Sequence, residues 1–252
     1  MTNNRIPTVS LFGVRVSKLD MEESVKVLTE AVQSREPHHV ITANPIMIMA
    51  ALEDAAYMTF MKQAEFIVPD GAGAVWAARY IGEPVAERVP GIELMHHLFE
   101  VGEQYGWRAY LLGASPEIIH EAYERVRVQY PRMKFVGYHD GYFTDSEDEA
   151  IIAKIKATKP DLLLVGRSAT TQEPWIGKYK QELGIPIMMG VGGSFDVLAG
   201  KIKRAPALFR KLGLEWLYRL LSEPTRWRRM LALPKFVWKV IRNRNQVGQD
   251  GW

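Results

Sequence analysis

Short apolar runs alternate with longer amphipathic segments along most of the chain. The runs at residues 39–42, 109–113 and 161–166 are rich in aliphatic side chains, which is typical of buried strands. Segments with apolar residues at helical spacing, such as residues 91–105, lie between them. Strand and helix alternate about six times, and this predicts an α/β fold whose mostly parallel sheet has helices on both faces.

The pattern places each expected element on the sequence. Strands are expected at residues 9–14, 39–42, 66–68, 109–113, 135–138, 161–166 and 185–191. Helices are expected at residues 20–32, 46–63 with a break near Asp54, 74–81, 91–105, 116–129, 145–157 and 174–183, with a loop at residues 168–172. After Gly200 the pattern changes to basic, aromatic helices at residues 208–221, 225–231 and 235–242. We therefore expect a core, residues 1–200, and a helical C-terminal appendage, residues 201–252.

The stretch Phe66-Ile-Val-Pro-Asp-Gly-Ala-Gly73 predicts a strand, a tight turn and the start of a helix. It presents the carboxylate of Asp70 at the carboxyl end of a strand, where open α/β sheets bind their ligands. Asp70 is therefore a candidate catalytic base. A helix N-cap is the alternative role, because aspartate is among the residues preferred at that position.

Other polar side chains also follow expected strands. They are Thr42, Asn44, Ser115, Tyr142, Gln172 and Asp196. One such residue is usually a helix cap. Polar groups after several strands predict a shared polar crevice at the carboxyl edge of the sheet.

Two glycine clusters follow strands, Gly71-Ala-Gly73 and Gly190-Val-Gly192-Gly193. Neither completes a dinucleotide fingerprint, because Trp76 replaces the third glycine of the first and no acidic residue lies about 20 positions after the second. Each is either a tight turn or a turn whose free N–H groups bind a pyrophosphate. The six histidines lack metal-ligand spacing and the sequence has no Asp-x-Asp, so no metal ion is expected.

The composition is that of a globular protein, with 47% hydrophobic and 24% charged residues among 252. No apolar run has the length needed to span a bilayer, and none is expected to act as a signal peptide. The absence of cysteine excludes disulfides and thiolate metal sites, and it fits a cytoplasmic protein.

The charge is unevenly distributed. Residues 198–252 contain 13 Lys or Arg against 3 Asp or Glu, a balance of +10; because the whole chain carries +3, residues 1–197 carry −7. In this basic tail Arg219, Arg226 and Arg229 would share one face of a continuous helix, beside Trp and Tyr residues. Such a face suits an anionic membrane surface. A solvated basic face is the alternative, and no nucleic-acid recognition motif accompanies the charge.

Seven segments, taken together and in their order, point to one family. They are Ile41-Thr-Ala-Asn-Pro45, Val68-Pro-Asp-Gly-Ala-Gly73, Arg88-Val-Pro-Gly91, Asp140-Gly-Tyr-Phe143, Gln172-Glu-Pro-Trp175, Val191-Gly-Gly-Ser-Phe-Asp-Val-Leu-Ala-Gly-Lys-Ile-Lys-Arg-Ala-Pro206 and Gly213-Leu-Glu-Trp-Leu-Tyr-Arg-Leu-Leu-Ser-Glu-Pro-Thr-Arg226. Over nearly its whole length the chain resembles the WecG/TagA/CpsF family of bacterial glycosyltransferases, and the TagA branch most. One segment departs from the family's Gly-x-Pro-x-Gln-Glu pattern. This chain has Gly166-Arg-Ser-Ala-Thr-Thr-Gln-Glu173, without the proline and with Arg167 at a strand end.

The resemblance implies an inverting, metal-independent hexosyltransferase with a Rossmann-like core and no cofactor. Such enzymes move a sugar from a UDP-sugar donor to GlcNAc linked to a polyprenyl diphosphate, at the cytoplasmic face of the cell membrane. The TagA branch transfers ManNAc from UDP-ManNAc in a β-1,4 linkage, in the synthesis of wall teichoic acid or a secondary cell wall polymer. The WecG branch uses ManNAc uronic acid, and this donor or another UDP-hexose is the alternative. The oligomeric state is left open, a homo-oligomer included.

The resemblance also implies roles for individual residues. Asp70 would be the general base. Thr42, Asn44, Arg88 and Gln172 would position donor and acceptor. The implied UDP-binding positions are Gly113, Tyr142, Gly192, Gly193 and Asp196. The tail arginines Arg219, Arg226 and Arg229 would close over the site and neutralise the diphosphate.

Two alternatives from other classes remain open. A non-catalytic nucleotide-binding module, recruited to membranes by its tail, would account for the charge distribution and the glycine turns. It would not account for Asp70, Arg88 and Gln172 occurring together with the tail arginines. A dinucleotide oxidoreductase is disfavoured because both glycine motifs are incomplete.

Overall fold

The structure, a computed structural model, describes residues 6–249 of the chain. These residues form two compact units, each assembled from separate stretches of the sequence. Unit 1 consists of residues 6–21, 42–90 and 204–249, and unit 2 consists of residues 22–41 and 91–203. The basic tail therefore belongs to the same unit as Asp70.

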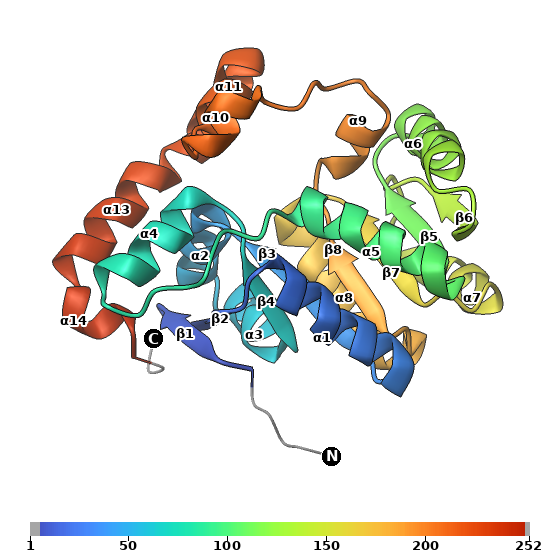
Figure 1. Ribbon diagram of the computed structural model, residues 1–252, viewed down its shortest axis with the longest axis horizontal. Coiled ribbons are helices and arrows are strands. Elements are labelled where there is room, and N and C mark those ends of the chain that lie inside the picture. The colour runs from blue at the N-terminus through green and yellow to red at the C-terminus, as the bar shows by residue number, and fades with distance from the viewer. Residues whose placement is uncertain (1–5, 250–252) are drawn as a thin grey trace. The chain divides into compact units, whose positions relative to one another are not determined.

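A six-stranded sheet carries its strands in the order β4-β3-β8-β7-β5-β6 (Figure 1). The strands are β3 (His38–Ala43), β4 (Phe66–Pro69), β5 (Arg108–Gly113), β6 (Lys134–His139), β7 (Leu162–Gly166) and β8 (Ile187–Gly190). Neighbours from β3 to β6 pair in parallel, with Leu164 of β7 in register with Leu111 of β5 and Met189 of β8. Residues that follow β5, β6, β7 and β8 in unit 2 therefore lie along one edge. The expected α/β fold with a mostly parallel sheet is confirmed.

Unit 2 packs helices against these strands. The helices are α1 (Met21–Ser34), α5 (Gly91–Tyr105), α6 (Pro116–Gln129), α7 (Asp148–Ala157), α8 (Ala169–Leu183) and α9 (Ser194–Leu198), with a 3₁₀ turn, η1 (Asp145–Glu147), before α7. Leu112 and Val165 of the sheet are buried with Trp175 of α8 in one hydrophobic cluster. The buried carboxylate of Asp148 accepts hydrogen bonds from Trp175 Nε1 (2.8 Å) and Tyr179 Oη (2.6 Å). Asp148 thus joins α7 to α8.

Helix α8 begins earlier than the sequence predicts. A loop at residues 168–172 is expected because proline favours the first turn of a helix, which would place the start of the helix at Pro174. This expectation is wrong, because Pro174 lies inside α8, where it removes one backbone hydrogen bond. Gln172 therefore lies on the helix, and its backbone N–H donates to Ser168 O (2.8 Å).

The N-terminal part of unit 1 is a hairpin followed by helices. Strands β1 (Thr8–Leu11) and β2 (Val14–Ser17) form a separate antiparallel sheet. A single strand at residues 9–14 is therefore wrong, because Phe12 and Gly13 turn the chain with φ of 55° and 82°. The expected break at Asp54 is confirmed: it separates α2 (Pro45–Glu53) from α3 (Ala55–Gln63) and caps α3 with its carboxylate. Helix α4 (Ala72–Tyr80) follows β4.

The tail forms short helices. They are α10 (Ala207–Lys211), α11 (Glu215–Ser222), the 3₁₀ turn η2 (Pro224–Arg226), α12 (Trp227–Met230), α13 (Ala232–Arg242) and α14 (Arg244–Val247). The condition for a shared face, one continuous helix through Arg219, Arg226 and Arg229, is not met, because α11 ends at Ser222 before Pro224. The seven-residue spacing therefore does not by itself place these arginines on one face.

The last helices of the tail are part of the hydrophobic core of unit 1. Phe236 and Val240 of α13 are fully buried, and α13 packs against α2 and α4. The ring of Phe236 lies edge-on to that of Phe12, with centroids 6.0 Å apart. The backbone N–H of Phe12 donates to Val247 O (2.9 Å). The two ends of the described chain therefore stabilise each other.

Candidate functional site

The turn at Asp70 is held by backbone hydrogen bonds on both sides. Asp70 N donates to Ala43 O (2.8 Å), at the end of β3, and Val89 N donates to Pro69 O (2.9 Å). Asp70 therefore lies between the residues that follow β3 and the loop that carries Arg88. The N-cap position of α4 belongs to Gly71, and no side chain caps that helix. Asp70 thus does not have the N-cap role considered as its alternative.

The turn after β3 packs closely against the Asp70 turn. Asn44 caps α2, since its Oδ1 accepts from Ile46 N (3.0 Å) and Met47 N (3.2 Å). A Cβ on Gly73 would lie 2.6 Å from Pro45 Cγ, so only glycine allows this approach. Thr42 is buried just before the turn. Thr42, Asn44 and Asp70 are therefore brought together in unit 1.

The tail reaches this group of residues through its first turn. Gly213, between α10 and α11, has φ of +69°, and a Cβ there would lie 2.6 Å from Ala72 Cβ, at the start of α4. Two residues later, Glu215 forms an ion pair with Arg88, and both side chains are about one-fifth exposed, 21% and 20%. The tail thus supplies a carboxylate to a candidate site residue.

The three tail arginines differ in their surroundings. Arg226 Nε donates to Glu223 Oε2 (2.6 Å), one turn earlier. Arg219 is half-buried on α11, and Arg229 is exposed on α12. Within residues 6–249 neither of these two has a carboxylate partner. Their guanidinium groups are therefore available to an anion.

Unit 2 holds the candidate UDP-binding residues, and glycine allows its strand ends to come close together. Gly113, at the end of β5, has φ of +136°, and a Cβ there would overlap the backbone of Gly166 at the end of β7. A Cβ on Gly141, after β6, would lie 3.1 Å from Gly113 Cα. The ends of β5 and β7 and the turn after β6 can therefore approach each other this closely only because glycine has no side chain.

Tyr142 and Asp196 flank this glycine edge within unit 2. The side chain of Tyr142 is 80% exposed, and its backbone N–H donates to Asp140 Oδ1 (2.8 Å). Asp196 lies in the first turn of α9, and a Cβ on Gly193 would be 3.5 Å from its Oδ2. Gly192 has φ of +49°. The turn at Gly192 and Gly193 therefore leads directly to Asp196.

The loop that carries Tyr142 is fixed by a capping box. Glu147 Oε2 accepts from Thr144 N (2.9 Å) and from Thr144 Oγ1 (3.0 Å). The backbone hydrogen bond, followed by the side-chain one, lowers the pKa of Glu147. The loop thus depends on an ionised carboxylate three residues beyond its start.

Gln172 lies in the interior of unit 2. Its side chain is 3% exposed, and its Oε1 accepts from Gly192 N (3.1 Å) and Arg167 N (3.3 Å). Its Nε2 donates to Glu173 Oε1 (2.7 Å). Gln172 therefore holds the ends of β7 and β8 through its oxygen.

Three residues of interest were not singled out as site residues from the sequence. Glu215 and Glu173 stand inside the motifs Gly-Leu-Glu-Trp and Gln-Glu-Pro-Trp, so the signal was present in the sequence. His39 lay in an expected strand with nothing to indicate its partner. Its Nε2 donates to Glu173 Oε2 (2.7 Å).

Arg167, the residue that departs from the family pattern, stacks on an aromatic ring. Its guanidinium carbon lies 4.3 Å from the centroid of the Phe143 ring, a cation–π contact. Its half-buried side chain has no carboxylate partner in the described part of the chain. Arg167 thus places a cation beside the loop that carries Tyr142.

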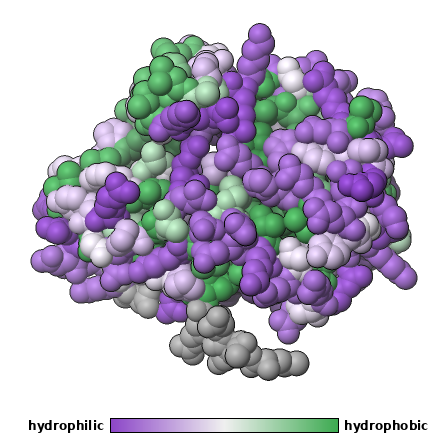
Figure 2. Space-filling view, in the orientation of Figure 1, coloured by the Kyte–Doolittle hydropathy of each residue, from purple (hydrophilic) through white to green (hydrophobic). Residues whose placement is uncertain are grey.

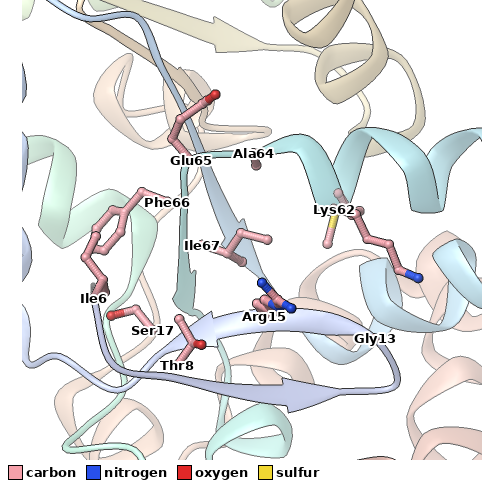
Figure 3. A pocket seen from close by; sticks show the side chains of 11 residues that line it. Ile6, Thr8, Gly13, Arg15, Ser17, Lys62, Ala64, Glu65, Phe66 and Ile67 are labelled. Carbon is pink, nitrogen blue, oxygen red and sulfur yellow. The ribbon is translucent and has the colours of Figure 1, made fainter. Parts of the chain in front are cut away.

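A cavity of about 690 Å³ opens elsewhere in unit 1 (Figure 3). Its lining comes from the β1–β2 hairpin, the end of α3 and the start of β4, and includes Thr8, Arg15, Ser17, Lys62 and Glu65. Asp70 follows the opposite end of β4. The cavity is therefore not at the candidate site. No three His, Asp or Glu side chains within residues 6–249 gather in a way that could hold a metal ion.

Known proteins resemble the chain over almost its whole length. The sequence model of the Glycosyl transferase WecG/TagA/CpsF family matches residues 9–249. The chain belongs to this family and is a glycosyltransferase. The N-acetylglucosaminyldiphosphoundecaprenol N-acetyl-beta-D-mannosaminyltransferase of Staphylococcus aureus (strain MW2) is 37% identical over 242 residues, 95% of this chain and 94% of that protein. The protein of the same name from Bacillus spizizenii (strain ATCC 23059 / NRRL B-14472 / W23) is 39% identical over 204 residues, 81% of this chain and 79% of that protein.

These matches decide between the three classes of protein considered from the sequence. The family resemblance seen in the sequence is confirmed. A non-catalytic nucleotide-binding module and a dinucleotide oxidoreductase both lose their support, since the family is one of glycosyltransferases.

Proposed function

We propose that the protein transfers ManNAc from UDP-ManNAc to GlcNAc-diphospho-polyprenol, forming a β-1,4 linkage. The observation that carries this proposal is the 37% identity, over 95% of the chain, with an enzyme named for this transfer to a GlcNAc-diphospho-lipid. The product would be a linkage unit of wall teichoic acid or of a secondary cell wall polymer.

Asp70 is the proposed general base. It would take the proton from the acceptor's sugar hydroxyl while that oxygen attacks the anomeric carbon of the donor, which inverts the configuration there. The placement of Asp70 supports this role, because it follows β4, is half-buried and does not cap α4. Thr42, Asn44 and Arg88 would position the reacting sugars beside it.

Arginines would neutralise the leaving UDP, so the reaction would need no metal ion. Guanidinium groups bind phosphate oxygens in pairs and keep their charge at all physiological pH values. Arg88 lies in the same unit as the tail, and Arg219 and Arg229 have no carboxylate partner among the described residues. Arg219, Arg226 and Arg229 would together balance the charge that develops on the diphosphate.

The donor would be held by unit 2. Open space where a Cβ on Gly192 would lie supports a close approach of the nucleotide to the end of β8, and Gly113 at the end of β5 would line the same edge. Tyr142 would contact the uracil ring, and Asp196 and the turn at Gly192 and Gly193 would hold the ribose and phosphates. The exposed ring of Tyr142 supports a stacking role, because 80% of this residue is open to solvent.

Membrane association is proposed for the tail. The acceptor lipid would stay in the cytoplasmic leaflet, and the enzyme would bind there peripherally. Figure 2 shows hydrophobic side chains gathered over α10 and α11, where Leu208, Leu212 and Leu221 are 65%, 61% and 67% exposed. No helix within the described residues has both the length and the apolar character needed to span a bilayer.

UDP-ManNAc uronate is a second candidate donor. Arg167 favours it, because its guanidinium is stacked on Phe143, has no carboxylate partner among the described residues and would suit the carboxylate of a uronic acid. This cation stands in the segment where the chain departs from the pattern of its family.

A donor screen tests the proposal. UDP release would be measured with UDP-ManNAc, UDP-ManNAc uronate, UDP-GlcNAc and UDP-glucose, each with one GlcNAc-diphospho-lipid acceptor. We expect turnover with UDP-ManNAc that depends on the acceptor. Turnover with UDP-ManNAc uronate alone would identify the second candidate as the donor. UDP release with every donor in the absence of the acceptor would contradict both proposed donors.

A further inference from the structure

A chain of buried polar side chains runs beneath the end of β8 in unit 2. His39, Gln172 and Glu173 are 1%, 3% and 0% exposed. Removing a carboxylate from water is costly even when it is paired. A buried pair of this kind is therefore weak evidence for added stability, and its geometry shows what else it does.

The row of buried side chains His39, Glu173 and Gln172 ends at two backbone N–H groups. Gln172 Oε1 accepts from Gly192 N, after β8, and from Arg167 N, after β7. A single amide oxygen thus ties together the carboxyl ends of two neighbouring strands. Both N–H groups belong to segments beside the proposed donor.

Glu173 and His39 fix the orientation of the Gln172 amide. A carboxamide can be reversed, and the reversed group would direct N–H groups toward Gly192 and Arg167. Glu173 opposes this, because its Oε1 accepts from Gln172 Nε2 and a reversed amide would place the Gln172 oxygen against that carboxylate oxygen. His39 donates to the other oxygen of Glu173 and fixes the carboxylate in turn.

Glycine at position 190 makes room for this arrangement. A Cβ on Gly190 would overlap Glu173 Oε1 and lie 2.5 Å from Gln172 Nε2. The end of β8 therefore has to be glycine for the two side chains to occupy their places. No positive φ requires glycine here, so the requirement is purely one of space.

We propose that His39 and Glu173 are positioning residues, which fix the Gln172 amide so that it holds the Gly192 turn and the Arg167 strand end in place for the donor's diphosphate. This rests on the proposed function, which puts the donor at the Gly192 turn. His39 and Glu173 touch no substrate. Glu173 acts through Gln172, and His39 acts through Glu173.

Asp148 provides a matched control on the same helix. It too is a buried carboxylate that accepts two hydrogen bonds, from Trp175 and Tyr179 of α8. It joins α8 to α7, and among the described residues no hydrogen bond or ion pair connects it to Gly192 or Arg167. We therefore expect Asp148→Asn to disturb the packing of α8 while leaving the hydrogen bonds from Gly192 N and Arg167 N to Gln172 in place.

The test compares Glu173→Gln, Gly190→Ala and Asp148→Asn. Titration calorimetry would measure UDP affinity, and circular dichroism would show that each variant is folded at the temperature used. We expect UDP to bind about tenfold more weakly to Glu173→Gln and to Gly190→Ala, because losing one hydrogen bond at a binding site changes affinity by about this factor. Asp148→Asn is expected to lose thermal stability and to keep its UDP affinity.

A second measurement does not depend on UDP or on turnover. Hydrogen exchange followed by NMR would report the Gly192 amide, which we expect to be protected in the wild type and in Asp148→Asn. It is expected to exchange faster in Glu173→Gln and in His39→Ala. His39→Gln retains an N–H donor and is expected to restore most of the protection.

The outcomes separate the inference from the proposed function. Normal UDP affinity in folded Glu173→Gln and Gly190→Ala would overturn the inference, and so would an equal loss in Asp148→Asn. If the wild type bound no UDP, the proposed function would fail, while hydrogen exchange at Gly192 would still decide whether His39 and Glu173 fix this turn.

Discussion

Arg88 and Glu215 form an ion pair although 127 positions separate them in the sequence. Arg88 lies in the loop after α4, next to Val89, which is hydrogen-bonded to Pro69 before the Asp70 turn. Glu215 is the first residue of α11 in the tail. Only one N–H group of the guanidinium is used by this pair. Glu215 can therefore hold Arg88 in place while its remaining N–H groups bind an anion.

We expect Glu215→Gln to lower kcat/KM for transfer about tenfold, because Arg88 loses the charge that orients it. UDP release with the lipid acceptor would measure this. The control is Glu83→Gln, which removes an exposed carboxylate paired with Lys18 in the same unit. Equal effects of the two substitutions, or none from Glu215→Gln, would show that the tail carboxylate does not act on Arg88.

Asp70→Asn is expected to reduce transfer by about 10²- to 10⁴-fold, the usual contribution of a general base. UDP affinity should stay close to that of the wild type, since the proposed donor contacts lie in unit 2. Asp54→Asn serves as the control, because it removes a negative charge from unit 1 and retains a good helix cap. Full activity in Asp70→Asn would remove Asp70 from the mechanism.

Gly213→Ala tests whether transfer activity needs the contact between the tail and the start of α4. Alanine at φ of +69° is strained, and its Cβ would also meet Ala72. Gly106→Ala carries the same strain at φ of +67° but has nothing within 4 Å. Both should lose about 1–2 kcal/mol of stability in thermal unfolding, whereas only Gly213→Ala should lose transfer activity. Similar activities in the two variants would contradict a role for the contact between Gly213 and Ala72.

The exposed apolar side chains of the tail predict membrane binding that depends on lipid charge. Replacing Leu212 and Trp216, 61% and 41% exposed, by serine should weaken binding to phosphatidylglycerol vesicles by about tenfold or more, as expected for the lost apolar area. Cosedimentation would measure it, and added salt should weaken the wild type as well. Val128→Ser is the control, since Val128 is 82% exposed in unit 2. An equal loss in the control would show that the tail is not the binding surface.

The capping box after Tyr142 predicts an acid-sensitive loop. Hydrogen bonds from Thr144 lower the pKa of Glu147 in the folded protein, so its contribution to stability is present above the ordinary glutamate pKa. This contribution is lost as the pH falls through the lowered value. The difference in melting temperature between wild type and Glu147→Gln should therefore shrink on acidification from pH 6 toward the lowered pKa. A difference that stays constant over this range would exclude the ionised carboxylate as its cause.

Local patterns of the sequence were sufficient for the fold class and for the place of Asp70. Apolar runs and turn residues are signals that lie within a few positions of each other, and they predicted β4, the Asp70 turn and α4. The β1–β2 hairpin was missed because its turn uses Phe12 at φ of 55°, a conformation that phenylalanine does not indicate. The start of α8 was also misplaced, because proline usually lies in the first turn of a helix, whereas Pro174 lies inside α8.

Long-range partners could not be predicted. Glu173 is 134 positions from His39, and no spacing rule relates residues that meet only when the sheet is formed. Equally, Gly213 gave no sign of its contact with Ala72. The places of single residues at strand ends were therefore predictable, whereas the residues that contact them from distant parts of the sequence became visible only in the folded chain.

The contact between Phe12 and Phe236 sets an order of events during synthesis. Unit 2 has all its residues once Lys203 has been added, but unit 1 still lacks the partner that buries Phe12. Domains fold as units while the chain emerges from the ribosome. The unit that carries Asp70 is therefore completed last, and a nascent chain contains the proposed base before it contains the tail residues that complete its surroundings.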